Sequence, residues 1–237
     1  MRCAVKKAFA ALACAIISAA VPFGSAEAAR DIRKVRGIEF KGLYYLSRYE
    51  VLKQVAYRVD GDALVIDLGT LREGLDKMAL IKKYSINEEG DRLTVVIEEN
   101  VPVYVVVLDR DDALVPVELD AGLRVLSTGT IHAAERPIIV ASAGELAGGR
   151  PSPRLRKTLE TLSELEKNGM PVLREIEEID MIEYPRLRVL LKGRRTVHTL
   201  EIDRGSFHTL NALVGYLDAT RYYPARSEVR PGAAVLK

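Results

Sequence analysis

The sequence predicts an α+β protein in three parts: an N-terminal apolar helix, a small β-α-α-β-β module and a second, β-rich α+β domain. Three observations support this prediction. An apolar run ends before residue 30, strand and helix patterns then alternate as far as Pro102, and strand patterns dominate the remainder. The predicted boundaries are therefore 1–29, 30–101 and 102–237.

The composition is that of a folded protein. The chain has 237 residues, 48% of them hydrophobic and 29% charged, which excludes bulk disorder and a polytopic membrane protein. Its 35 basic and 33 acidic residues nearly balance, which argues against a nucleic-acid-coating protein. Both cysteines, Cys3 and Cys14, lie near the N-terminus, so the remainder has no disulfide framework, thiolate metal site or cysteine nucleophile.

The N-terminal segment has the three parts of a secretory signal. A basic head with Arg2, Lys6 and Lys7 precedes an apolar run at 8–23 and small residues at 26–29. The run has about 16 residues, fewer than the roughly 20 that span a bilayer. Local physics therefore favours a cleaved signal peptide over an uncleaved anchor. Either alternative places the body outside the cytoplasmic membrane.

The module at 30–101 combines two helices with short strands. Ser47 is a suitable N-cap for the first helix and Thr70 for the second. Polar residues at 87–91 have the chemistry of a hairpin turn. The segments predicted to be extended are 35–42, 63–68, 81–86 and 92–98.

The C-terminal part has two predicted helices among many strands. An amphipathic helix begins at Ser152 or Pro153 and ends at Asn168, and a second covers 206–220. The tail at 227–237 could form a last strand that Pro231 divides. The other segments predicted to be extended are 103–108, 113–119, 123–126, 137–141, 176–183, 187–191 and 197–202.

No constellation of catalytic or metal-ligating residues is evident. The histidines lack metal-ligand spacing and are interpreted as structural or solvated residues: His132, His198 and His208. Asp109 and its acidic neighbours lack the glycine and glutamate of a calcium loop. The chain has no G-x-S-x-G elbow and no P-loop. We therefore expect no enzyme activity, no cofactor and no metal.

The order of short motifs resembles the bacterial cell division family FtsQ, called DivIB in Gram-positive bacteria. Residues 35–47, V-R-G-I-E-F-K-G-L-Y-Y-L-S, resemble the opening strand of its POTRA domain. Further matching segments follow in the family's order: 64–81, 93–103, 115–125, 137–140 and, more weakly, 227–235. Ala79-Leu80-Ile81 replaces the family's P-W-V. Pro231 follows the segment that replaces its terminal D-L-R, where we expect it to interrupt the last strand.

The resemblance implies a non-catalytic divisome scaffold. Such a protein has a single membrane-spanning anchor, with a POTRA domain and a β domain on the periplasmic side at the division septum. It binds FtsB- and FtsL-like partners and helps control septal peptidoglycan synthesis, with no small-molecule substrate and no nucleic acid. The family usually retains the N-terminal segment as an anchor, while a cleaved periplasmic protein stays the alternative.

A scaffold of this kind would add a partner strand to an open sheet edge. We expect this edge at 227–237, and a second one in the POTRA module at 35–40 or its neighbour. Tyrosine and arginine are common in binding hot spots, although the tyrosines could instead pack beneath the loop at 219–225. The predicted partner-binding residues are Tyr216, Tyr222, Tyr223, Glu228, Val229 and Arg230.

Two other functions remain open at this point. One is a secreted or outer-membrane-associated POTRA-containing assembly or chaperone protein, although the chain has one such module and no series of barrel strands. The other is a cleaved periplasmic hydrolase, against which the missing nucleophile argues.

Overall fold

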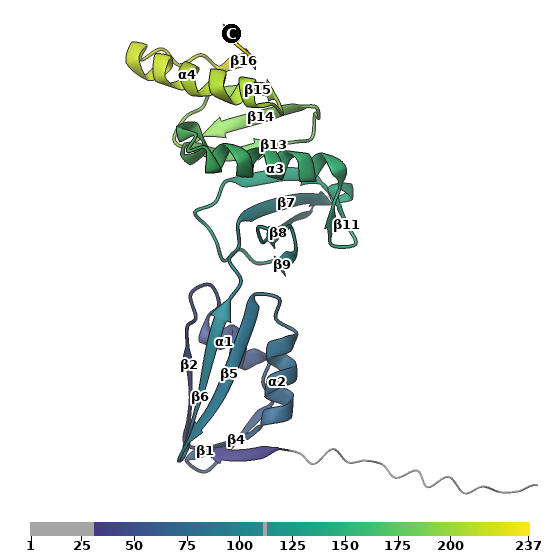
Figure 1. Cartoon of the computed structure of the whole chain (residues 1–237), viewed down its shortest axis with the longest axis vertical. Coiled ribbons are helices and arrows are strands. Elements are labelled where there is room, and N and C mark those ends of the chain that lie inside the picture. The colour runs from purple at the N-terminus through teal and green to yellow at the C-terminus, as the bar shows by residue number, and fades with distance from the viewer. Residues whose placement is uncertain (1–30, 111–112) are drawn as a thin grey trace, which may run out of the picture. The chain divides into compact units, whose positions relative to one another are not determined.

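A computed structural model describes residues 31–110 and 113–237 (Figure 1). The predicted signal peptide or anchor lies outside these residues. Among the described residues, no helix is long and apolar enough to cross a membrane. Residues 31–237 form one compact unit with two apolar cores, and the smaller core, built mainly from residues 35–97, also includes Leu126. We call 31–101 the N-terminal lobe and 102–237 the C-terminal lobe. The mixed α+β class is confirmed.

The N-terminal lobe contains two small sheets and two helices. One sheet has the strand order β1-β4-β3, and the other has the order β2-β6-β5, with β2 parallel to β6. Strand β2 is therefore an edge, in agreement with the expected edge at 35–40. The elements are β1 Ile32–Val35, β2 Gly37–Lys41, α1 Arg48–Lys53, β3 Tyr57–Asp60, β4 Ala63–Asp67, α2 Leu68–Asp76, β5 Ile81–Glu89 and β6 Arg92–Glu99.

The single strand predicted at 35–42 is two strands. The chain breaks at Arg36, whose N–H donates to the Asp91 carbonyl at 2.7 Å. Strand β1 then pairs with β4 in the first sheet, and β2 pairs with β6 in the second. Strand β3 was not predicted, because its four residues are all exposed and give no pattern of burial. The lobe therefore has more strands than the sequence predicted.

The helix caps confirm one prediction and correct another. The Ser47 side chain accepts from the Glu50 N–H, and the Glu50 carboxylate accepts from the Ser47 N–H, so α1 begins with a capping box. Thr70 is not the cap of α2. Asp67 is, because it ends β4 and its carboxylate accepts from the Gly69 N–H at 2.8 Å. Thr70 lies inside the helix and donates to the Asp67 carbonyl.

The C-terminal lobe is built on a nine-stranded sheet with the order β17-β16-β15-β14-β13-β10-β7-β8-β9. Helices α3 (Pro153–Lys167) and α4 (Arg204–Thr220) share one apolar core and lie on the same side of the sheet (Figure 1). The strands are β7 Tyr104–Arg110, β8 Ala113–Leu119, β9 Val125–Thr128, β10 Ile138–Ser142, β13 Ile176–Asp180, β14 Arg186–Leu191, β15 Val197–Glu201, β16 Arg226–Arg230 and β17 Ala233–Leu236.

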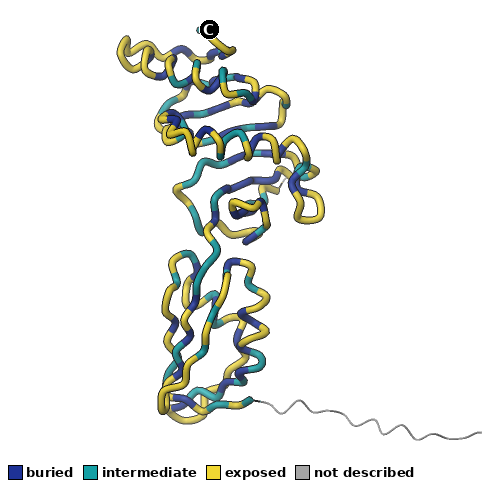
Figure 2. The backbone as a smooth tube through the Cα atoms, in the orientation of Figure 1, coloured by how far each residue is buried: buried dark blue, intermediate teal, exposed yellow. Residues whose placement is uncertain are grey.

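Burial follows the pattern expected for this arrangement. Buried residues follow the central strands and the inner sides of both helices, whereas the turns are exposed (Figure 2). Ser152 caps α3 as expected, and Asp203 caps α4, which begins at Arg204, two residues before its predicted start at 206. A small hairpin, β11 (Leu146–Ala147) with β12 (Arg150–Pro151), precedes α3, and a 3-10 turn at Pro171–Arg174 follows it.

The C-terminal tail corrects a further expectation. Pro231 does not interrupt a strand but stands with Gly232 in the turn between β16 and β17, where no ladder hydrogen bond is needed. Gly232 has φ +77°, a conformation that favours glycine. Its N–H donates to the Thr209 hydroxyl of α4 at 2.8 Å. The tail is therefore a hairpin held against α4.

Candidate functional site

The nine-stranded sheet has two edge strands, β9 and β17, and β17 lies within the predicted segment 227–237. Strand β16 pairs with β15 on one side and with β17 on the other, whereas β17 pairs with β16 alone. Arg226 and Lys237 exchange both backbone hydrogen bonds, at 3.1 and 2.9 Å. Because such pairs alternate along an antiparallel ladder, the backbone groups of Ala234 and Leu236 point away from β16. They are the groups that a further strand would use.

The three predicted tyrosines surround the C-terminal end of α4. Each is more than half exposed, so Tyr222 and Tyr223 do not pack beneath the loop at 219–225. The Tyr223 hydroxyl donates to the Asp218 carboxylate at 3.3 Å. Tyr216 and Asp218 belong to α4, and Tyr223 precedes β16 by three residues. Large aromatic surface therefore stands near the end of the hairpin where Arg226 pairs with Lys237.

The predicted residues of β16 divide between its two faces. Val229 is only 2% exposed and packs in the core under α4, so its side chain cannot contact a partner. This prediction was wrong, because residues alternate in a strand and the helix covers the face that carries Val229. Glu228 and Arg230 point to the other face, where they line a small hollow together with Arg186.

Charges on that face are organised around Glu228. Its carboxylate accepts from the Lys237 ammonium of β17 at 2.5 Å. This hydrogen bond, with help from the charges of Lys237, Arg186 and Arg230, holds the pKa of Glu228 below its usual range. The edge hairpin therefore presents basic side chains around a single carboxylate, that of Glu228, whose negative charge is paired with Lys237.

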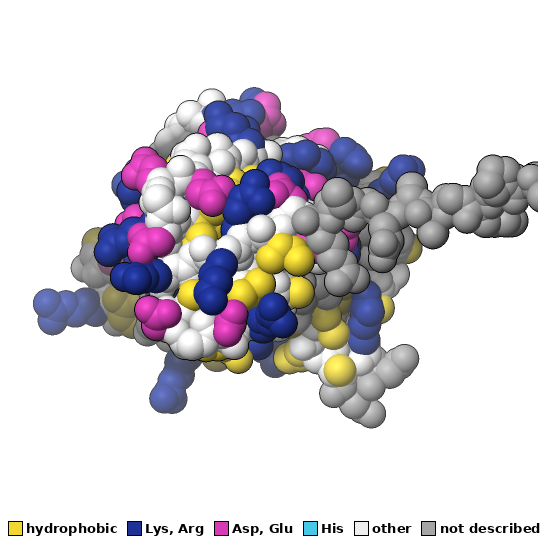
Figure 3. Space-filling view, turned by 90° about the horizontal axis from the view of Figure 1, so that it is seen from below, with side chains coloured by type: hydrophobic (Ala, Val, Ile, Leu, Met, Phe, Trp, Pro, Cys, Tyr) yellow, Lys and Arg dark blue, Asp and Glu magenta, His cyan; other side chains and the backbone are white. Residues whose placement is uncertain are grey.

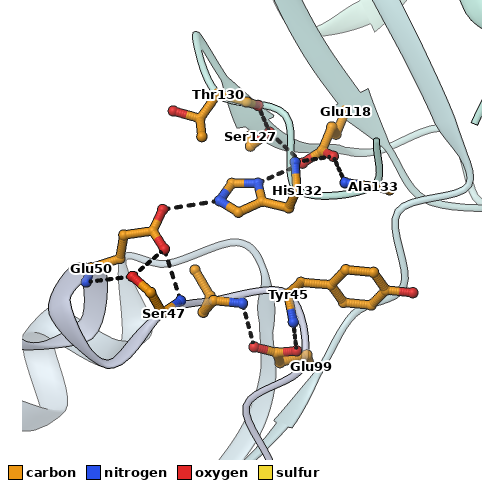
Figure 4. A network of polar contacts seen from close by, with 10 residues as sticks. Tyr45, Ser47, Glu50, Glu99, Glu118, Ser127, Thr130, His132 and Ala133 are labelled. Carbon is orange, nitrogen blue, oxygen red and sulfur yellow. Dashed lines mark hydrogen bonds and ion pairs between the residues drawn. The ribbon is translucent and has the colours of Figure 1, made fainter. Parts of the chain in front are cut away.

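A second group of polar residues, not predicted from the sequence, surrounds Glu118 of β8. Glu118 is fully buried, and one of its oxygens accepts from the backbone N–H groups of His132 and Ala133, each at 2.7 Å (Figure 4). The other oxygen meets the Ser127 hydroxyl and Nδ1 of His132, each at 2.7 Å. A buried carboxylate with this many donors is well satisfied.

The His132 ring continues this network to the N-terminal lobe. Its Nε2 lies 3.1 Å from Oε1 of Glu50, whose other oxygen serves the capping box of α1 (Figure 4). Burial opposes the charged imidazole, but hydrogen bonds to Glu118 and Glu50 outweigh it and raise the His132 pKa. The sequence carried one signal of this network, an acidic residue within the apolar run V-P-V-E-L at 115–119.

A third polar group lies beneath α4. His198 of β15 is fully buried, and its Nδ1 is 2.7 Å from the Ser227 hydroxyl of β16. Its Nε2 and Nη1 of Arg194 are buried without a hydrogen-bond partner among the described residues. Burial, with a contribution from the Arg194 charge, lowers the His198 pKa to about 4. His198 is therefore a neutral core residue, whereas His208 is exposed on α4.

Charged side chains at the end of the N-terminal lobe are interspersed. In Figure 3, basic and acidic groups alternate around a smaller group of apolar side chains. Lys34 pairs with Asp60 at 3.0 Å and Arg36 with Asp91 at 3.3 Å. The face drawn in Figure 3 therefore carries no patch of a single sign among its described residues.

Away from the edge, a cavity of about 280 Å³ lies between α3 and the strands β7, β10 and β13. Its floor is apolar, with Ile139 and Ile176 among its residues, and Arg136 pairs with Glu166 at its rim at 3.3 Å. Residues 31–110 and 113–237 contain no group of three or more acidic, histidine or cysteine side chains that could hold a metal ion.

No protein-family profile matches the chain, and no curated protein is significantly similar to it.

Proposed function

We propose that this chain is a non-catalytic divisome scaffold of the FtsQ/DivIB type. Its body would lie on the periplasmic side of the cytoplasmic membrane, and its N-terminal segment would anchor it there. An FtsB- or FtsL-like partner would add a strand to β17 and so bring septal peptidoglycan synthesis under the scaffold's control. The alternative is a cleaved periplasmic protein, in which the mature chain would begin near residue 29.

The order of elements supports this proposal. The N-terminal lobe has a strand, two helices and two further strands in the order expected for a POTRA domain, with β2 parallel to β6 in a mixed three-stranded sheet. The hairpin of β3 and β4 is inserted between the helices. The C-terminal lobe then places a long sheet after the connection at Pro102.

The observation that carries the proposal is the open edge at β17. An edge strand presents unpaired N–H and C=O groups to another chain. Val235 on this strand is 55% exposed, and Tyr216, Tyr222 and Tyr223 provide aromatic surface near it. Basic residues at Arg186 and Arg230 complement a partner with carboxylates beside its added strand.

The sharpest test changes one outward-facing backbone donor. Replacement Ala234→Pro removes the Ala234 N–H, which β16 does not use, and leaves the β16–β17 ladder intact. One lost hydrogen bond and the clash of the ring should weaken binding of an FtsB-like periplasmic segment by about tenfold. The binding constant would be measured by titration calorimetry with the full chain in detergent.

The matched control is Ala234→Ser, which retains the N–H and should bind like the wild type. Equal binding by Ala234→Pro and Ala234→Ser would rule out strand addition at β17. Truncation after residue 225 is a poorer test, because it also removes the buried Ser227 and Val229. Septal localisation of a tagged chain, with filamentous cells on its depletion, would separate a divisome role from other POTRA-containing assembly proteins.

A further inference from the structure

The His132 ring lies between two carboxylates that belong to different lobes. Nδ1 is 2.7 Å from Glu118 of β8, and Nε2 is 3.1 Å from Glu50 of α1 (Figure 4). A neutral imidazole has only one N–H, so it can donate to one of these carboxylates and must turn a lone pair toward the other. Only the imidazolium can donate to both. The geometry is therefore that of a doubly protonated ring.

Both carboxylates are held in their ionised form. Glu118 accepts hydrogen bonds from two backbone N–H groups, from the Ser127 hydroxyl and from the His132 ring. Together these hydrogen bonds outweigh the effect of burial and lower the pKa of Glu118. Hydrogen bonds from Ser47 at the helix cap lower the pKa of Glu50. Two negative charges thus flank a ring that is only 7% exposed.

The remaining charged groups at this place belong to the N-terminal lobe. A hollow of about 350 Å³ beside His132 is lined by Lys53 of α1 and Lys77 at the end of α2, along with Glu50. Strand β9 contributes no charged side chain to it. The two lysines oppose the imidazolium charge, but neither forms a hydrogen bond to the ring, whereas both carboxylates contact it directly.

We propose that His132 is a pH-sensitive latch that fastens the N-terminal lobe to the C-terminal lobe when its ring is protonated. When the ring loses a proton, it keeps the N–H that faces Glu118, because a ring lone pair turned toward this fully buried carboxylate would meet it at 2.7 Å with no water to screen the repulsion. The Glu50 side chain is 34% exposed, so water can replace the ring there. Deprotonation therefore breaks the bond between the lobes and spares the loop around Glu118.

The latch acts on a junction that also has an apolar contact. Leu126 of β9 is buried within the apolar core of the N-terminal lobe. This contact does not depend on pH, so opening of the latch loosens the junction rather than separating the lobes. The raised His132 pKa keeps the latch closed below about pH 6.5 and opens it as pH rises through that pKa. Acid below the lowered pKa values of Glu50 and Glu118 opens it again.

The test measures the distance between the lobes at two pH values. The full chain in nanodiscs, with Cys3→Ser and Cys14→Ser, would carry spin labels at Glu73→Cys on α2 and Lys157→Cys on α3. Both label positions are exposed. We expect a narrow distance distribution at pH 5.5 and a broader one at pH 8.5. An identical distribution at both pH values would overturn the proposal.

The decisive variant is Glu50→Gln. Glutamine also occurs at this position of a capping box, so α1 should still begin at the same residue. The negative charge that stabilises the His132 imidazolium is lost. We expect this variant to show the same distribution at both pH values, and the His132 pKa, followed by NMR of its ring, to fall toward 6.5. His208→Gln, on an exposed face, should respond to pH like the wild type. If Glu50→Gln responds like the wild type, or leaves the His132 pKa unchanged, the latch does not exist.

Discussion

Two histidines of the C-terminal lobe whose rings are largely covered have opposite surroundings. His132 lies between Glu118 and Glu50, and these carboxylates raise its pKa. His198 lies under α4 beside the Ser227 hydroxyl, with Arg194 nearby, and burial lowers its pKa to about 4. Burial acts against the charged form at both sites. The comparison shows that ionised partners can outweigh burial at one histidine, whereas burial without such a partner keeps the other neutral.

The first way to break this comparison is to remove the ionised partner of His132. Replacement Glu118→Ala leaves the buried ring and two backbone N–H groups without their acceptor. We expect the free energy of unfolding to fall by about 3 to 5 kcal/mol, as measured by urea denaturation at pH 6. Glu135→Ala, an exposed acidic residue of the same connection, is the matched control and should change it little. A small effect of Glu118→Ala would mean that the network adds no stability.

The second prediction concerns the titration of His198. Because its pKa is lowered to about 4 in the fold, the unfolded chain binds this proton first as pH falls below about 6.5. The free energy of unfolding should therefore fall by about 1.4 kcal/mol for each pH unit between 6.5 and 4.5 on account of His198.

The variant His198→Gln removes this titration and keeps a polar group near Ser227. Its loss of stability between pH 6.5 and pH 4.5 should be smaller than that of the wild type by about 2 to 3 kcal/mol. His208→Gln should follow the wild-type curve, because that ring is exposed. Parallel curves for His198→Gln and the wild type would show that His198 is already protonated in the fold.

The third prediction sharpens the comparison by removing the neutral partner. Ser227→Ala takes away the hydrogen bond to Nδ1 of His198 and should lower the free energy of unfolding by about 1 kcal/mol. Ser85→Ala, an exposed serine on β5, is the control. A loss as large as that of Glu118→Ala would mean that a neutral hydroxyl matters as much as an ionised carboxylate, contrary to the comparison.

Local features of the fold could be predicted because neighbouring residues determine them. Ser47 and Glu50 form a capping box within one turn, and Ser152 caps α3 in the same way. The apolar periodicity of α3 and the alternation in β6 are likewise properties of short segments. The cap of α2 was misplaced by three residues, because Asp67 and Thr70 are both good caps and only the end of β4 selects between them.

The candidate binding site was predicted only in part. The sequence places tyrosines and a late strand near the C-terminus, but it left open whether Tyr222 and Tyr223 are exposed. The burial of Val229 does not, since it depends on which face of β16 α4 covers. Pro231 gave the wrong expectation because a proline that ends a strand and a proline in a turn are alike until the partner strand is known.

By itself, the sequence determined the α+β class, the starts of α1 and α3, the cysteine-free body and the presence of a late strand. The tertiary structure alone decided that β17 is an edge strand, that Val229 is buried, and that His132 joins Glu118 to Glu50. The physical reason is sequence separation. Glu50 and His132 lie 82 positions apart, so their contact depends on how the chain folds between them and leaves no local pattern.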